Sequence, residues 1–199
     1  YNTTVGNVVS GTNNIIGDAG TSESLTHGVN GNIVGNNGVG TLAIGSVLFD
    51  ADSDGLITHR DLLDHTGPTK SLALGRSSLA IDAGDNSQAK DASGVTLLND
   101  QRGQQRVREG NLDQVETVDI GAYEMATPII VNTLEDTVIV DEFTSLREAI
   151  TAAHLIGGDN VIDFADSLNG GTITLDNSEI GIGSNIFIRG LGRDNLTID

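Results

Sequence analysis

Short runs of apolar, mostly β-branched residues recur near both ends of the chain, and each run is ended by Gly or Asn. Gly and Asn tolerate the left-handed backbone that a sharp corner requires. We therefore predict short strands of three or four residues that are separated by tight corners. The predicted strands lie at residues 6–9, 13–17, 31–35, 161–164, 172–175, 185–188 and 195–198.

The spacing of these runs indicates how the strands stack. In the C-terminal part the runs follow one another about every 10–13 residues, which gives two strands per coil of about 20–25 residues. Such short strands cannot bury an apolar face alone, so coils must stack in parallel to make a continuous core. Asn residues at equivalent corners can then form hydrogen-bonded ladders between coils. We predict an all-β fold, a parallel β-helix; the alternative is an antiparallel sandwich with Gly/Asn hairpins.

One segment has the pattern of an amphipathic helix. Ser145 is a suitable N-cap, and Glu148 three residues later completes a capping box. Gly157 and Gly158 end the pattern. A short α-helix directly before a run of strands is well placed to cover the open end of a solenoid, which is a structural role. Its apolar stripe consists of Leu146, Ala149, Ile150 and Ala153.

The remaining segments differ from both patterns. Residues 85–118 are polar and lack strand periodicity, so we predict long loops that lean on the solenoid. Residues 126–142 are expected to be a connector, and residues 40–49 a strand. The predicted organisation is therefore coils and closing loops at 1–125, a connector at 126–142, and a capping helix with further coils at 143–199.

Composition and charge exclude several partners. The chain of 199 residues carries 28 acidic and 10 basic side chains, a formal net charge of −18, and residues 1–59 contain no Lys or Arg. Binding to nucleic acid or to an anionic membrane needs clustered basic residues, so we expect neither. No apolar run approaches the roughly 18 residues of a membrane-spanning helix. The lack of Cys is compatible with an extracellular protein that needs no disulfides.

The most specific motif is the segment 50–61, which fits the twelve-residue EF-hand calcium loop. Three alternating carboxylates repel one another unless a divalent cation lies between them, so we predict a Ca²⁺ site. The alternative is a solvated acidic turn. Asp in place of Glu at position 12 shortens the reach of that ligand, and we expect a dissociation constant of about 10⁻⁴–10⁻³ M. The predicted ligands are Asp50, Asp52, Asp54, the backbone carbonyl of Leu56, Thr58 and Asp61.

Three further motifs resemble a known family. They are Gly75–Gly84 (GRSSLAIDAG), Asp100–Gly103 (DQRG) with Arg106, and Asp119–Glu124 (DIGAYE). Together they resemble the closing segment of bacterial extracellular right-handed β-helix proteins of the pectin-lyase-like superfamily, of the choice-of-anchor type. Ser78-Leu79 replaces the usual Ser-Pro. The resemblance implies a right-handed parallel β-helix with one capping helix and long polar loops.

A second set of motifs looks like the opening segment of the same family. It consists of Thr144–Ile150 (TSLREAI), Asn160–Phe164 and Gly171–Leu175, with Thr144 in place of the usual Cys. The resemblance covers about residues 67–125 and 143–199, and the closing motif precedes the opening motif. We expect either a window on a tandem array within a longer chain or a permuted unit whose coils stack on neighbouring copies, head to tail.

The leading hypothesis is a structural, calcium-stabilised β-helix of a secreted or cell-surface fibre, sheath or adhesin, without catalytic residues. Asp82 and Glu124 are expected to anchor loops as hydrogen-bond acceptors, and the arginines to form salt bridges. The alternative is a module that binds or cleaves polysaccharide, for which this fold is often used. There is no Trp for a sugar platform, and the two Tyr are Tyr1 and Tyr123. The expected partners are copies of itself or adjacent repeats, with surface glycans as a further possibility.

Overall fold

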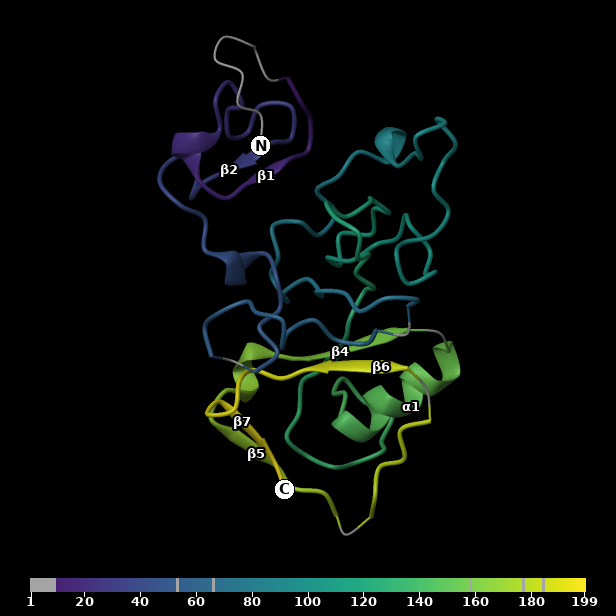
Figure 1. The fold of residues 1–199 in the computed structure, drawn as a ribbon. Helices are drawn as coiled ribbons and strands as arrows, with labels where there is room; N and C mark the ends of the chain where they lie inside the picture. Colours follow the sequence, from purple (N-terminus) through teal and green to yellow (C-terminus); the bar gives the residue numbers. More distant parts are fainter. Residues whose placement is uncertain (1–9, 53, 66, 158, 177, 184) are drawn as a thin grey trace. The chain divides into compact units, whose positions relative to one another are not determined.

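The computed structural model describes residues 10–52, 54–65, 67–157, 159–176, 178–183 and 185–199. The chain divides into two compact units, the first unit Tyr1–Met125 and the second unit Ala126–Asp199 (Figure 1). The second unit has regular strands and an α-helix, whereas the first consists largely of turns and loops. Each unit is described separately below.

In the second unit the chain alternates between two parallel sheets (Figure 1). β3 (Ile129–Val131), β4 (Asn160–Phe164) and β6 (Ile186–Arg189) form one sheet, and β5 (Gly171–Ile173) and β7 (Leu196–Ile198) form the other. Asn160 pairs with Ile186 and Gly171 pairs with Leu196, so the chain returns to the same sheet after 26 and 25 residues. This return is the geometry that stacked coils require.

The helix α1 (Leu146–Ile156) forms as its sequence predicts. Ser145 accepts a hydrogen bond from the Glu148 backbone N–H, and the Glu148 carboxylate accepts one from the Ser145 N–H, which is a complete capping box. The helix packs against β3 and β4. Its apolar stripe therefore closes over a core that the strands line from the other side. The buried core residues are Val131, Leu146, Ala149, Ile150, Ala153, Ile162, Phe164, Leu168 and Ile173.

The first unit begins with a smaller version of the same pairing. β1 (Ile15–Ile16) and β2 (Ile33–Val34) are parallel, with Ile15 opposite Ile33. Beside them, Asn14 Nδ2 donates to Asn32 Oδ1 at 2.8 Å, which is the kind of contact that an asparagine ladder requires. In the described residues of this unit, the remaining regular elements are the 3₁₀ turns η1 (Ala19–Thr21), η2 (Ile44–Ser46) and η3 (Asn86–Gln88).

Two segments differ from the prediction. The expected connector 126–142 contains β3, because its run Ile129–Val131 is β-branched and Val131 is buried in the core. The expected strand at 40–49 contains the 3₁₀ turn η2 instead. There Gly45 interrupts the apolar run, and Ser46 Oγ donates to the Ala43 carbonyl at 2.6 Å, a local bond that competes with strand pairing.

Six predicted strands overlap β1, β2, β4, β5, β6 and β7, and the seventh, residues 6–9, lies outside the described residues. Every pairing between these named strands is parallel, whereas a sandwich built of hairpins needs antiparallel pairs. The right-handed β-helix as a whole stays a prediction. In the described part of the chain no helix is both long and apolar enough to cross a bilayer.

Candidate functional site

The loop 50–61 brings three of its predicted ligands together. Asp50, Asp52 and Asp54 each offer a carboxylate oxygen, and these oxygens lie within 4.8 Å of one another. Three negative charges at this separation repel one another, and a divalent cation between them converts that repulsion into attraction. An all-oxygen set of ligands suits Ca²⁺ or Mg²⁺ rather than a softer metal.

Asp50 has the environment expected of the first ligand in such a loop. Gly55 donates its backbone N–H to Asp50 Oδ2 at 2.7 Å, and Gly55 has φ +84°, a conformation that favours glycine. The other oxygen, Asp50 Oδ1, is buried and has no hydrogen-bond partner. A buried carboxylate oxygen without a donor is costly, so this atom fits a cation ligand.

The middle of the loop is ordered by short backbone contacts. The Leu56 N–H donates to Asp54 Oδ1 at 2.8 Å, and the Arg60 N–H donates to Thr58 Oγ1 at 3.1 Å. Arg60 also lies 3.8 Å from Asp52, but both side chains are well exposed and such a pair contributes little. The carboxylates of Asp52 and Asp54 therefore remain accessible to an ion.

Asp61 differs from the other carboxylates of the loop. It is only 1% exposed, Oδ1 accepts the Ala51 N–H at 2.8 Å, and Oδ2 accepts the Thr58 N–H at 2.6 Å. The hydrogen bond from Thr58 lowers the pKa of this carboxyl below its ordinary value. Asp61 thus ties the two ends of the loop together, and it does not belong to the group formed by the three other aspartates. Its predicted role as a bidentate ligand stays a prediction.

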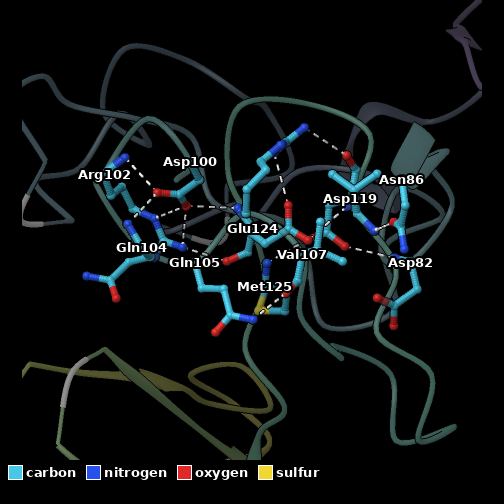
Figure 2. A network of polar contacts seen from close by, with 12 residues as sticks. Asp82, Asn86, Asp100, Arg102, Gln104, Gln105, Val107, Asp119, Glu124 and Met125 are labelled. Atoms are coloured by element: carbon cyan, nitrogen blue, oxygen red, sulfur yellow. Dashed lines mark hydrogen bonds and ion pairs between the residues drawn. The ribbon is translucent and has the colours of Figure 1, made fainter. Parts of the chain in front are cut away.

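A second constellation joins the three motifs of the closing segment (Figure 2). Asp119 Oδ1 accepts the Asp82 N–H at 2.8 Å, and Oδ2 accepts the Met125 N–H at 2.5 Å. Glu124 Oε1 accepts the Asp119 N–H at 3.0 Å, and Oε2 accepts Arg106 at 3.0 Å. Segments that are distant in sequence are therefore held by carboxylates, and we call this set of contacts the closing network.

Asp100 organises the other half of the closing network. Its Oδ1 accepts the backbone N–H groups of Arg102 and Gln104, and its Oδ2 accepts Arg102 Nε and the Glu124 N–H. The Arg102 guanidinium also lies 3.7 Å from the ring centroid of Tyr123, which is 4% exposed. Tyr123 is therefore buried beneath an arginine.

Two carboxyl groups of the closing network, Asp119 and Glu124, have raised pKa values. Burial, together with the neighbouring Asp119 carboxylate, raises the pKa of Glu124 to about 8. Burial raises the pKa of Asp119 to about 6, although the N–H donors of Asp82 and Met125 oppose the shift. Because backbone donors surround these groups, their arrangement serves to fasten the chain.

The sequence predicted part of this network. Glu124 accepts hydrogen bonds as expected, and Asp82 Oδ2 accepts the Gly110 N–H at 3.1 Å. The anchoring roles of Asp100 and Asp119 were missed. Their position as the first residue of DQRG and of DIGAYE was the available signal, because an Asp that opens a turn commonly accepts backbone N–H groups.

The arginines of the second unit also form ion pairs, as predicted. Arg147 binds Asp136 through two nitrogens at 2.9 and 2.6 Å, and Arg189 binds Asp163 at 2.7 and 2.6 Å. Arg189 lies in β6 directly opposite Asp163 in β4, so this pair links the two neighbouring strands. The arginines that pair with buried carboxylates thus act as structural counter-ions.

Comparisons of the chain with protein-family models, with curated proteins and with solved structures give no match.

Proposed function

We propose that this chain is a structural, calcium-stabilised β-helix segment of an extracellular or cell-surface fibre, sheath or adhesin. The observation that carries the proposal is the parallel return of the chain to each sheet of the second unit after 25 and 26 residues. A fold that repeats in this way extends by adding coils, which is the property a fibre needs.

The strand order indicates how such an array would grow. Among the described residues, β6 and β7 stand last in their two sheets. A further coil, from an adjacent repeat or a second copy, would extend both sheets by the same parallel pairing. The partner in this proposal is therefore another β-helix coil, joined head to tail.

In this proposal, bound calcium stabilises the folded chain. The group Asp50, Asp52 and Asp54 needs the folded loop to come together, so an ion bound there stabilises the folded state by mass action. At a calcium concentration 100 times the dissociation constant the gain is about 2.7 kcal/mol. Extracellular calcium concentrations suit the expected affinity of about 10⁻⁴–10⁻³ M.

The alternative, a polysaccharide-binding or polysaccharide-cleaving module, receives less support from the described residues. Tyr123, one of only two tyrosines, is buried beneath Arg102 and cannot offer its face to a sugar ring. The buried carboxylates of the closing network accept backbone N–H groups, which is a structural role. We therefore assign no catalytic residues.

Electron microscopy of the full chain in calcium and in EGTA tests this function. We expect rods or filaments in calcium, and fewer or shorter ones after chelation. Asp52→Asn with Asp54→Asn should reduce the thermal stabilisation by calcium, whereas Glu116→Gln, which removes one exposed charge, should leave it unchanged. Isolated globules under all conditions, or turnover on a polysaccharide panel, would overturn the proposal.

A further inference from the structure

A second group of three carboxylates lies in the first unit, outside the EF-like loop. Asp82, Glu109 and Asp113 each offer a carboxylate oxygen, and these oxygens lie within 4.8 Å of one another. Asp82 belongs to the first closing motif, and the other two belong to the long polar loop 85–118. Close acidic side chains on a surface are common, so the group alone would not indicate a ligand.

The two carboxylate oxygens of Asp82 have different environments. Its Oδ2 accepts the Gly110 N–H at 3.1 Å, whereas its Oδ1 is buried and has no hydrogen-bond partner. Its backbone N–H donates to Asp119, so the residue is fixed in place by the closing network. A fixed carboxylate with one buried, unsatisfied oxygen next to two further carboxylates is costly unless a cation compensates it.

The same arrangement occurs at Asp50. Among the described residues, buried carboxylate oxygens without a partner are found at Asp50 and Asp82, and each of these belongs to a group of three carboxylates. In both residues the other oxygen accepts a glycine N–H, from Gly55 and from Gly110. The orphaned oxygens thus both belong to groups of three close carboxylates.

We propose that Asp82, Glu109 and Asp113 bind a second divalent cation, with Ca²⁺ as the ion that suits an irregular all-oxygen site. This site is separate from the EF-like loop and does not depend on the proposed function. The turn that carries the last two ligands is already ordered, because Glu109 Oε1 accepts the N–H groups of Leu112 and Asp113. The ion would fasten that turn onto Asp82 and so onto the closing network.

Calorimetric titration of the full chain with CaCl₂ tests the second site. We expect two ions per wild-type chain, one for Asp52→Asn/Asp54→Asn, one for Glu109→Gln/Asp113→Asn, and none for the combined variant. The matched control Glu116→Gln, in the same polar loop, should still bind two. The proposal is overturned if Asp52→Asn/Asp54→Asn binds no calcium, or if Glu109→Gln/Asp113→Asn binds as many ions as the wild type.

Hydrogen exchange tests the second site without mutating its ligands, in case Glu109→Gln/Asp113→Asn fails to fold. In the Asp52→Asn/Asp54→Asn background, amide hydrogen exchange is compared in calcium and in EGTA. Slower exchange of the amides of residues 110–115 in calcium supports the site, and unchanged exchange overturns it. If calcium does not slow exchange at residues 50–61 of the wild-type chain, the EF-like site is contradicted. That outcome does not affect the test of the second site at residues 110–115.

Discussion

The two units of the chain are ordered by different means. The second unit buries one apolar core, in which Val131, Ile162 and Phe164 are at most 1% exposed. The first unit buries several carboxylates, and Asp61, Asp119 and Glu124 are also at most 1% exposed, whereas the buried Asp163 of the second unit is paired with Arg189. Apolar side chains neither titrate nor bind metal ions, whereas buried carboxylates depend on donors, counter-ions and protons. The two units should therefore fail under different perturbations.

The chain offers one spectroscopic probe for each unit. Tyr123 is in the first unit, and in a Tyr1→Phe background its fluorescence would report that unit alone. The α-helix that the described residues contain lies in the second unit, so helical circular dichroism reports that unit. The predictions below use both probes, from the largest expected effect to the smallest.

Phe164→Ala should produce the largest loss, about 3–5 kcal/mol, because it leaves a cavity in the core of the second unit. The loss should appear in the helical signal and should be the same in calcium and in EGTA. Ile182→Ala, at a residue that is 58% exposed, is the matched control and should change little. A calcium-dependent rescue of Phe164→Ala would contradict the separation of the two units.

Asp100→Asn should destabilise the first unit by about 3 kcal/mol, since it removes the carboxylate that pairs with buried Arg102 at 2.7 Å. An amide also presents a donor where the carboxylate accepts backbone N–H groups. Denaturant titration followed by Tyr123 fluorescence measures the loss, and Glu116→Gln serves as the exposed control. Equal stability of the two variants would show that the closing network contributes nothing.

The pH dependence of the first unit should follow Glu124. Its folded-state pKa of about 8 lies above the ordinary value of 4.5, so its contribution to stability is full below that value and is lost as pH rises towards 8. We expect a decrease of about 2–4 kcal/mol between pH 4.5 and 8.5 in EGTA. Glu124→Gln cannot titrate and should flatten the profile. An unchanged slope in that variant would assign the dependence to other groups.

The sequence predicted most where the structure is set by local rules. The Ser145–Glu148 capping box and the strands predicted at residues 161–164 and 185–188, which overlap β4 and β6, follow from spacing and β-branching alone. Local rules failed at residues 40–49, where the Ser46 hydroxyl donates to the backbone and the chain forms a 3₁₀ turn instead of a strand. They also failed at residues 126–142, where the strand β3 forms and Val131 is buried in the core.

The sites were predictable only in part, for a related reason. The alternating aspartates at 50, 52 and 54 are neighbours in sequence, so their convergence could be foreseen. Asp82, Glu109 and Asp113 come from two segments of the first unit, and only tertiary packing brings them together. The same holds for Asp100 and Glu124, whose contact spans 24 residues.

Hydrogen exchange of the full chain, resolved by peptide and compared in about 10 mM calcium and in EGTA, tests most directly the claim that ions order the first unit and apolar burial the second. We predict slower exchange in calcium at residues 50–61 and 109–115, and no change in α1 or β4. An equal effect of calcium on both units, or no effect on either, would contradict the account.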